Sequence, residues 1–472
     1  MQLYDTRSRS IREFRPLAPP NVTMYCCGPT VYDVTHIGHM RKYIMDDILK
    51  RALRAEGYLV KHVMNITDVG HLSDDADLGE DKLEKGARKH GKSVWDVAAE
   101  YTAFFHETMR KVGVEPPDIE PKATDHIEGM VALIRDLEAH GYTYETAQAV
   151  YFDTRKFAAY GALSGQKLED KQVAVRDDVH ADPDKRRPQD FALWFKRVGR
   201  FANHTMHWDS PWGDGFPGWH IECSAMSMAY LGPEIDIHTG GIDHIPVHHE
   251  NEIAQSEAAT GKQFVQFWVH HNFLMVDGRK MSKSLGNVYT YLDLEARGIN
   301  PLAVRYLFLQ SHYRQEMNFT WEAAAAAQTA FERLRGLETA LRASEPLPVT
   351  TDAALKTKTT FRAAIADDLN TAKALAVLWE ALGNAAIPAG EKRTLLAEFD
   401  AVFGFGLAQL PAWERKPLTD LPPDVTKLLK QRADARSRKD WAAADALREE
   451  LASRGYTVED AGGTTLVYSK EL

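Results

Sequence analysis

The order of apolar and polar residues over the first 70 positions predicts a strand, a helix and a second strand. A short apolar run, VTMYCC, leads into a Gly-Pro turn at residues 28–29. From residue 36, apolar positions recur at helical spacing along HIGHMRKYIMDDILKRALRAEG, which ends at Gly57. The next run, YLVKHVMNITDV, is rich in β-forming residues. This strand–helix–strand unit predicts an α/β fold with a parallel sheet.

The pattern changes after residue 118. Residues 119–205 contain a helical stretch, short strands and the polar segment DDVHADPDKRRPQD, and we interpret them as an insertion into the sheet domain. A further strand entering a glycine turn is predicted by EIDIHTGGID, and a helix by HHENEIAQSEAAT. From about residue 322 the chain is rich in Ala and Leu at helical period, which predicts a helix bundle. A Pro-rich linker and a small basic segment from about residue 424 follow.

Composition and charge narrow the class of protein. The 472 residues are enough for several domains, and 44% hydrophobic with 26% charged residues is ordinary for a soluble globular protein. The sequence has no apolar run of about 20 residues and no secretory signal. Three cysteines argue against a disulfide scaffold, so we expect a cytoplasmic protein with no membrane contact. A net charge of -10 confines any nucleic-acid contact to local basic patches.

The tetrapeptide His-Ile-Gly-His at residues 36–39 begins the first predicted helix. A helix N-terminus that follows a strand attracts phosphate, and Gly38 lets a flat ring approach the backbone. The imidazole N–H groups of His36 and His39 could donate to phosphate oxygens as charge develops. The alternative is a pair of histidines that caps a surface helix.

A second cationic segment, GRKMSKSLGN, spans residues 278–287. Lys280 and Lys283 stand among glycines and serines, as expected of a flexible loop that closes on a polyphosphate. The alternative is a solvated basic turn.

A third group of residues has the chemistry of a metal site. Cys223, His248 and Glu252 are zinc-ligand types, and the last two are four residues apart, on one face of a helix. Cys26 or Cys27 could supply a second thiolate. Three further histidines compete as ligands: His238, His244 and His249. The alternatives are buried cysteines that only pack and an i,i+4 pair on a helix surface.

Taken together, these motifs resemble a known family. The pair HIGH and KMSKS resembles the signature of class I aminoacyl-tRNA synthetases, and YCCGPTVYD, GWHIECSAM and HHENE resemble the cysteinyl-tRNA synthetase family in particular. Further counterparts are NITD, KATDHI, DDLNTAKAL and ADALREELASRGYTVED, so the likeness covers nearly the whole chain.

The resemblance implies a Rossmann-type catalytic domain with an insertion, an α-helical bundle and a small anticodon-binding domain. Its expected divisions are the first catalytic half at 1–118, a connective insertion at 119–205, the second half at 206–264, a KMSKS-bearing stem-contact region at 265–321, the bundle at 322–410, and a linker with the anticodon-binding domain at 411–472.

The resemblance also implies roles for individual residues. The zinc ligands would be Cys27, Cys223, His248 and Glu252, while Cys26 would be a packing residue. The ATP-binding residues would be Thr30, His36, Gly38, His39, Lys280 and Lys283, of which the two histidines and two lysines would be catalytic. The cysteine pocket would comprise Gly28, Thr67, Trp219 and Asp243.

The implied reaction joins L-cysteine to the 3′ end of tRNA(Cys) through cysteinyl-adenylate, with ATP and Mg²⁺. One Zn²⁺ per chain would bind the substrate as thiolate and so exclude serine, which a hydrophobic pocket discriminates weakly. No editing domain would then be needed. We expect a monomer.

The sequence departs from the family pattern in two places. Gly70-His71-Leu72 and an acidic stretch stand where acid-acid-Lys is common, and His244 follows Asp243 in an altered turn before HHENE. None of the expected ligands is changed, but the surroundings of the pocket are, including the role of His244.

The C-terminal segment should contact tRNA. A local basic face suited to phosphate is predicted from Lys427, Lys430, Arg432, Arg436, Arg438 and Lys439. Trp441 could stack on a base, although we expect it to be buried in a small core.

Three other functions are compatible with parts of the sequence. A cysteine ligase of mycothiol synthesis would use an amino-sugar acceptor and lack the basic tail. An inactive paralogue would only bind tRNA, and a structural-zinc protein would bind nucleotide without turnover. Intact HIGH, KMSKS and ligand motifs disfavour the inactive paralogue.

Overall fold

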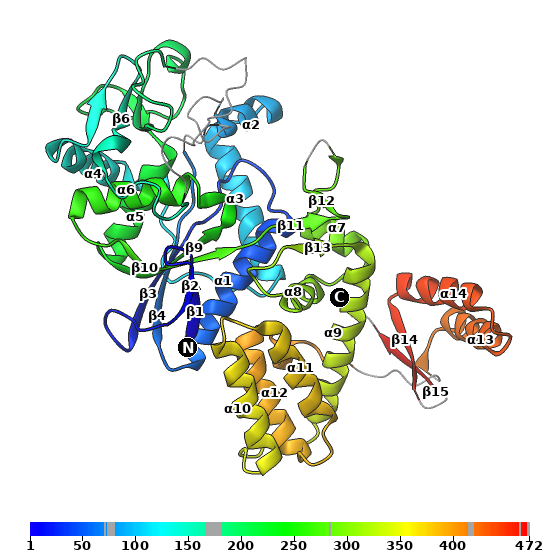
Figure 1. Ribbon diagram of the computed structural model, residues 1–472. Coiled ribbons are helices and arrows are strands. Elements are labelled where there is room, and N and C mark those ends of the chain that lie inside the picture. The colour runs from blue at the N-terminus through cyan, green and yellow to red at the C-terminus, as the bar shows by residue number, and fades with distance from the viewer. Residues whose placement is uncertain are drawn as a thin grey trace. The chain divides into compact units, whose positions relative to one another are not determined.

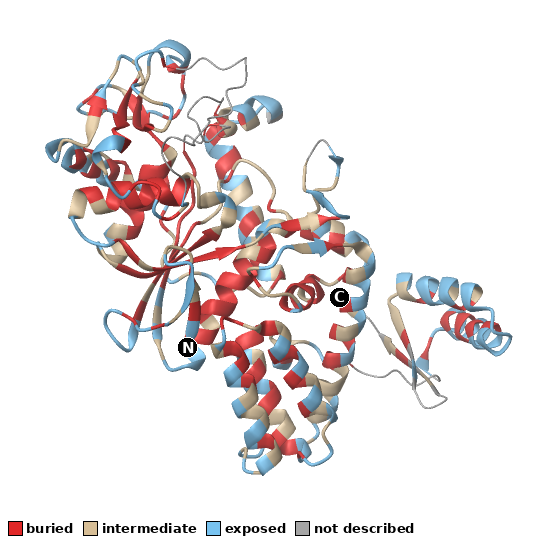
Figure 2. Cartoon of the chain, viewed as in Figure 1, coloured by how far each residue is buried: buried red, intermediate tan, exposed pale blue. Residues whose placement is uncertain are grey.

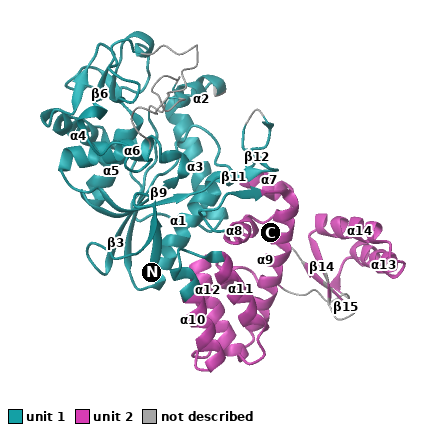
Figure 3. Ribbon diagram, viewed as in Figure 1, with its two compact units in different colours: residues 1–290, 311–318, 363–371 teal, residues 291–310, 319–362, 372–472 magenta. Residues whose placement is uncertain are grey.

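The computed structural model describes residues 1–69, 72, 81–165, 182–282, 285–413, 420–461 and 464–469 (Figure 1). It divides into two compact units (Figure 3). Unit 1 comprises residues 1–290, 311–318 and 363–371, and unit 2 comprises residues 291–310, 319–362 and 372–472. Among the described residues, no helix combines the length and the apolarity that crossing a bilayer requires.

A four-stranded parallel sheet forms the centre of unit 1. Its strand order is β10 (Val265–His271), β9 (Ile235–Gly241), β3 (Asn21–Cys26), β4 (Leu59–Met64). Buried residues run along these strands (Figure 2), as expected for a parallel sheet covered on both faces. The strand order reverses between β3 and β9, and the crevice at the carboxyl ends of such strands is the usual ligand site. The predicted α/β fold is therefore confirmed.

Helix α1 (Ile37–Ala55) connects β3 and β4 and begins at the HIGH turn. Its side chains are buried around most of its circumference, including the charged Arg41, Asp46 and Lys50. The Arg41 guanidinium donates to four backbone carbonyls, those of Asn272, Phe273, His312 and Gln315. These bonds attach the HIGH helix to two segments. One, at residues 272–273, leads to residues 278–287, here called the lysine loop, and the other contains residues 312–315. Unit 1 also contains α2 (Lys82–His90), α3 (Val94–Lys111), α5 (Trp219–Leu231) and α6 (His248–Thr260), and α2 packs on α3.

The segment predicted as an insertion begins with α4 (Ile127–Ala139) and continues as an antiparallel sheet. The strands of this sheet are β5 (Thr143–Glu145), β6 (Ala149–Phe152), β7 (Phe191–Lys196) and β8 (Gly215–Pro217), so it continues past residue 205. Helix α6 holds the loop after β6. The Glu250 carboxylate accepts hydrogen bonds from the backbone of Gly161 and Ser164, at 2.7 and 2.9 Å, and the Tyr160 hydroxyl donates to Asn251 at 2.5 Å.

The lysine loop follows a tight hairpin. Strands β11 (Leu274–Val276) and β12 (Arg279–Lys280) are joined by Asp277 and Gly278, both at positive φ. Asn287 closes the loop, because its side chain accepts from the Ser282 backbone at 2.8 Å and donates to the Lys280 carbonyl at 3.3 Å. Two more strands pair at the N-terminus, β1 (Gln2–Asp5) and β2 (Ser10–Glu13), and β13 (Met317–Phe319) pairs with β11.

Unit 2 is built mainly from helices, as the Ala- and Leu-rich pattern predicts. They are α7 (Tyr291–Ala296), α8 (Pro301–Leu309), α9 (Trp321–Leu341), α10 (Asp352–Ala366), α11 (Thr371–Gly383) and α12 (Ala389–Phe403). The last part of the chain contains α13 (Pro423–Ser437), α14 (Trp441–Ser453), β14 (Tyr456–Ala461) and β15 (Thr464–Ser469). A separate small core joins α13, α14 and this hairpin around Leu428, Leu451 and Val467.

Two predictions for this last segment are wrong. Arg432 is not part of an open basic face, because it is buried and its guanidinium donates to both carboxylate oxygens of Asp460, at 3.1 and 2.7 Å. Trp441 is not buried: 56% of it is exposed, and the Arg436 guanidinium lies 5.7 Å from its ring centroid. Helix α14 buries Ala444 and Leu451, and Trp441, at the start of that helix, stays outside this face.

Candidate metal centre and phosphate pocket

A cavity of about 530 Å³ opens in unit 1 at the carboxyl ends of the strands. Its lining includes residues predicted for three purposes. Three proposed metal ligands line it, Cys27, Cys223 and His248. So do the described residues expected to bind ATP, which are Thr30, His36, Gly38, His39 and Lys280. The residues expected to form the cysteine pocket complete the set: Gly28, Thr67, Trp219 and Asp243. Lys283 lies outside the described residues, as do Gly70, His71 and residues 73–80.

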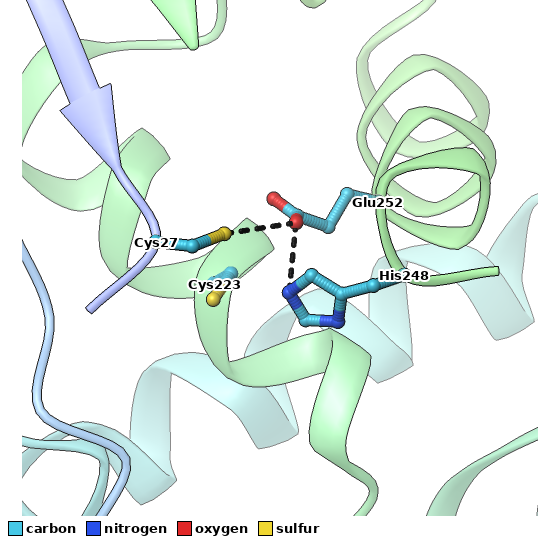
Figure 4. A group of neighbouring side chains, drawn as sticks. All are labelled: Cys27, Cys223, His248 and Glu252. Atoms are coloured by element: carbon cyan, nitrogen blue, oxygen red, sulfur yellow. Dashed lines mark hydrogen bonds and ion pairs between the residues drawn. The ribbon is translucent and has the colours of Figure 1, made fainter. Parts of the chain in front are cut away.

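Four buried side chains converge at one end of the cavity (Figure 4). Cys27 follows β3, Cys223 lies on α5, and His248 and Glu252 lie one turn apart on α6. One ligand atom from each of the four lies within 4.8 Å of the others. The Glu252 Oε1 atom is 3.0 Å from His248 Nε2 and 3.9 Å from Cys27 Sγ. The structure therefore brings together the four residues that the resemblance named.

This donor set fits zinc. Two sulfurs, one imidazole nitrogen and one carboxylate oxygen are all zinc-ligand atoms, and tetrahedral ligands of zinc stand roughly 3.3–3.8 Å apart. The two distances to Glu252 Oε1, 3.0 and 3.9 Å, lie close to that spacing. Helix α5 begins after Gly218 and helix α6 after Val247. Residues near the start of each helix, Trp219 and His248, line the cavity.

The two thiols are electrostatically unequal. Burial and the hydrogen bond with Cys223 raise the pKa of Cys27 well above its ordinary value. The same hydrogen bond lowers the pKa of Cys223 to about 6, although burial opposes the shift. Cys223 therefore carries the negative charge that the thiol of Cys27 stabilises. Glu252 and Cys223 raise the pKa of His248 to about 10 against the effect of burial, so a metal would have to displace a proton from His248 as well as from Cys27.

Neighbouring rings fix the orientation of His248. Its Nδ1 atom lies 2.9 Å from Nδ1 of His220, which leaves Nε2 directed at Glu252. The Trp219 ring stacks on His248 with centroids 4.1 Å apart. A ring nitrogen held in this way is the usual arrangement for a metal-binding histidine.

Two of the competing histidines form a second possible donor set with Cys27 and Glu252. His249 Nε2 is 3.3 Å from Cys27 Sγ, and His238 Nε2 is 2.9 Å from Glu252 Oε2. One ligand atom from each of these two histidines, from Cys27 and from Glu252 lies within 4.8 Å of the others. His244 lines the cavity outside both sets, and burial lowers its pKa to about 4.

At the other end of the cavity, His36 and His39 stack with centroids 3.6 Å apart. Nδ1 of His36 accepts from the His39 backbone, and Nδ1 of His39 accepts from the His36 backbone, both at 3.4 Å. Desolvation lowers the pKa of His36 to about 4 and that of His39 well below its ordinary value, so both rings are neutral at pH 7. A neutral ring that accepts at Nδ1 carries its proton at Nε2, so both Nε2–H groups are available to an anion.

The lysine loop lies against the HIGH turn. A Cβ on Gly38 would be 2.3 Å from Cε of Met281, so the flexible end of the Met281 side chain lies directly against Gly38. The Ile37 amide is occupied by the carbonyl of Tyr289 at 2.8 Å, which leaves fewer free helix amides for phosphate than the sequence predicts. Lys280 is exposed, with its ammonium 5.3 Å from the centroid of Phe273.

The predicted cysteine-pocket residues line the same cavity. A Cβ on Gly28 would lie 1.5 Å from the Asn65 carbonyl oxygen, so only glycine fits there. The Gly28 amide donates to the Asn65 side chain at 2.9 Å, and that side chain donates to Thr67 Oγ1 at 3.0 Å. Asp243 is exposed at the cavity wall.

Several residues of the site were missed from the sequence. The Asn65 side chain accepts from the Gly28 amide, and His220 contacts His248. His270 lies 2.8 Å from His249. Lys42 lines the cavity one turn after His39. Lys42 could have been predicted to lie beside His39, because residues three apart on a helix share a face.

Comparison with known proteins identifies the family. Residues 13–329 match the family described as tRNA synthetases class I (C) catalytic domain, and residues 418–467 match the cysteinyl-tRNA ligase anticodon binding domain. The chain is 47% identical to cysteine–tRNA ligase 1 of Burkholderia lata over 98% of this chain and 95% of that protein. It is 43% identical to cysteine–tRNA ligase of Treponema denticola over 98% and 99% of the two chains.

A solved structure shares the fold. Mycobacterium tuberculosis methionyl-tRNA synthetase, in complex with methionyl-adenylate, has a TM-score of 0.57 at 17% identity, covering 96% of this chain and 98% of its own. The chain thus belongs to the cysteine–tRNA ligase family of class I aminoacyl-tRNA synthetases.

Proposed function

We propose that the chain joins L-cysteine to the 3′ end of tRNA(Cys) in two steps. The cysteine carboxylate attacks the α-phosphorus of ATP, which gives cysteinyl-adenylate and pyrophosphate. A terminal ribose hydroxyl of the tRNA then attacks the acyl carbon and releases AMP. The observation that supports the proposal is one cavity lined by three residues of the Cys27, Cys223, His248 and Glu252 cluster and also by the stacked His36 and His39 rings.

The proposed metal is one Zn²⁺, held by Cys27, Cys223, His248 and Glu252. When bound, zinc would take the substrate sulfur as a thiolate ligand, which the hydroxyl of serine cannot match. His220 and Trp219 would keep the His248 ring in place for this purpose. Discrimination between cysteine and serine would then need no second, hydrolytic site.

The first step depends mainly on positioning, because a carboxylate is already a competent nucleophile. The Nε2–H groups of His36 and His39 would donate to the α-phosphate as charge develops there. Lys280 would stabilise the departing pyrophosphate together with Mg²⁺. The same role is expected of Lys283.

The remaining pocket residues would orient the amino acid. Asp243 offers a carboxylate to the substrate ammonium, and Thr67 and Trp219 shape the space between the two ends. Thr30 and Gly38 would line the nucleotide side.

The C-terminal segment would contact tRNA through exposed cations of α13 and the turn after it. Lys427, Lys430, Arg438 and Lys439 are exposed, unlike Arg432. The match to an anticodon-binding domain over residues 418–467 disfavours an amino-sugar acceptor. The intact donor set and HIGH turn disfavour an inactive tRNA-binding paralogue and a merely structural zinc protein.

Two assays test the proposal. Cysteine-dependent exchange of pyrophosphate into ATP should be observed without tRNA, and serine should not replace cysteine. Charging of transcribed tRNA(Cys) should follow. Exchange without charging would favour a sugar-ligase activity, and nucleotide binding without exchange would favour a structural or regulatory role.

A further inference from the structure

Lys42 is a cation of the cavity to which the proposed mechanism gives no role. It lies on α1, and only 14% of its side chain is exposed. Its ammonium donates a hydrogen bond to the backbone carbonyl of Cys27, the proposed ligand at the end of β3. It also forms an ion pair with Asp46 Oδ2 at 2.8 Å, one turn further along the helix.

A third residue supports this pair from the sheet. His271, at the end of β10, places Nε2 2.7 Å from Oδ1 of Asp46. The side chains of His271 and Asp46 are each 3% exposed. The chain of contacts therefore runs from one edge strand of the sheet, through α1, to the carbonyl of Cys27.

Burial alone would disfavour a charged lysine at this position. The ion pair with Asp46 supplies the opposite charge that a buried ammonium needs. Asp46 in turn has its pKa held below the ordinary range by Lys42 and His271, against the effect of burial. The ammonium is therefore a fixed positive charge, with two of its three N–H donors directed at named partners.

We propose that Lys42 is a positioning residue of the metal centre: backed by Asp46 and His271, its ammonium holds the Cys27 carbonyl and so fixes the Cys27 thiolate where the metal and the substrate sulfur meet. This inference rests on the zinc site proposed above. Residues that hold metal ligands in place typically contribute about 10–100-fold to metal affinity or activity.

The charge of the donor set gives a second reason for a cation here. Two thiolates and one carboxylate carry three negative charges, and Zn²⁺ neutralises two of them. In a buried site the remaining charge needs a compensating partner. The Lys42 ammonium lies against the backbone of one thiolate residue and lowers the electrostatic cost of this charge without becoming a ligand, although it also balances Asp46.

Metal titration of three variants tests the proposal. Lys42→Met should lower Zn²⁺ affinity, measured by competition with a chelator, about 10–100-fold. It should also shift the visible spectrum of the Co²⁺-loaded protein and raise KM for cysteine, while KM for ATP stays within about twofold. Lys42→Arg should restore most of the affinity. Asp46→Asn, which keeps the size of the side chain, should shift affinity in the same direction by less.

Lys50→Met is the matched control. Lys50 lies on the same helix, is 2% exposed, and donates to the carbonyl of Pro116 at 2.9 Å, away from the cavity. Its replacement should lower the melting temperature and leave Zn²⁺ affinity and the Co²⁺ spectrum unchanged.

Two results would overturn the inference. One is wild-type Zn²⁺ affinity and spectrum in Lys42→Met, or in Asp46→Asn if the methionine variant does not fold. The other is a raised KM for cysteine with unchanged metal binding, which would make Lys42 a direct substrate contact. A wild-type protein that binds no Zn²⁺ would instead reject the proposed function itself.

Discussion

The two ends of the cavity are built in different ways. At the metal end, Cys27, Cys223, His248 and Glu252 are each at most 4% exposed, and rings, helices and buried ion pairs surround them. At the phosphate end, Lys280 is exposed on a two-residue strand that leads into a loop. On the proposed function, the preorganised end would receive the substrate sulfur and the more adaptable end the polyphosphate.

This difference has an energetic meaning. Preorganised groups lose little entropy when a ligand binds, so small chemical differences such as sulfur against oxygen are expressed fully in affinity. Exposed lysines must be ordered when phosphate binds, which costs about 0.5–1.5 kcal/mol for each side chain immobilised. We therefore expect changes at the metal end to disable both cysteine recognition and turnover, and changes at the phosphate end to leave the metal in place.

The largest expected difference is between substitutions of the two adjacent cysteines, Cys27 and Cys26. Cys27→Ser should abolish bound zinc and cysteine-dependent pyrophosphate exchange, because serine is a poor zinc ligand. Cys26 is fully buried, and Cys26→Val should keep both. Zinc analysis and the exchange assay check the pair. Equal effects of the two substitutions would show that the wrong thiol has been assigned.

The next prediction concerns the phosphate end alone. Lys280→Ala should reduce pyrophosphate exchange about 100-fold, as is typical when a group that stabilises developing charge is removed. Its zinc content should equal that of the wild type. Arg279→Ala is the control, since Arg279 precedes Lys280 on the same strand but does not line the cavity. Loss of zinc in the Lys280 variant would mean that the two ends are not independent.

A smaller effect is expected from replacing His220, which contacts the proposed ligand His248 but is not itself a proposed ligand. His220→Asn should weaken zinc binding about tenfold, because His248 loses its 2.9 Å partner. Chelator competition measures the change, and the KM for ATP serves as the internal reference. An unchanged zinc affinity would show that Trp219 and the helix suffice to orient the ring.

The two ends should also differ in their response to pH. Burial and Cys223 raise the pKa of Cys27, and Glu252 and Cys223 raise the pKa of His248 to about 10 against the effect of burial. Two protons must therefore leave before metal binds, and zinc affinity should rise up to about 100-fold per pH unit from about pH 6 to pH 8. His36, with a pKa of about 4, stays neutral over this range, so KM for ATP should change less than about twofold. Metal titrations and exchange kinetics at several pH values test both parts. A zinc affinity independent of pH would contradict the assigned protonation of the thiols.

Much of the fold was predictable because the controlling patterns are local. The strand before Cys26, the helix from the HIGH turn to residue 55 and the helix at HHENE follow from periodicity and capping. The family motifs identified the four residues that converge in the structure. The close approach of Gly28 to Asn65 was not predictable, because it depends on the pairing of two strands 37 residues apart.

The wrong predictions depend on how residues that are distant in sequence come together in the fold. Arg432 fits a basic helix face in sequence, yet its partner Asp460 is 28 residues away in a strand. Trp441 fits a small core by composition, but the face that α14 buries is set by Ala444 and Leu451. The contact of His271 with Asp46 was not predictable, because the two residues are more than 200 positions apart. Lys42 and Asp46, in contrast, are four residues apart on one helix.

The five residues of HHENE serve separate tasks, and this affects how the motif should be used to annotate other sequences. Only His248 and Glu252 belong to the proposed ligand set, whereas Glu250 and Asn251 hold the loop around residues 160–164. A descendant that lost its metal would still be under selection at Glu250 and Asn251 to keep its shape. On the proposed ligand set, a partial match to HHENE in a diverged gene would mark ancestry, and the first histidine together with the second glutamate would mark a metal site.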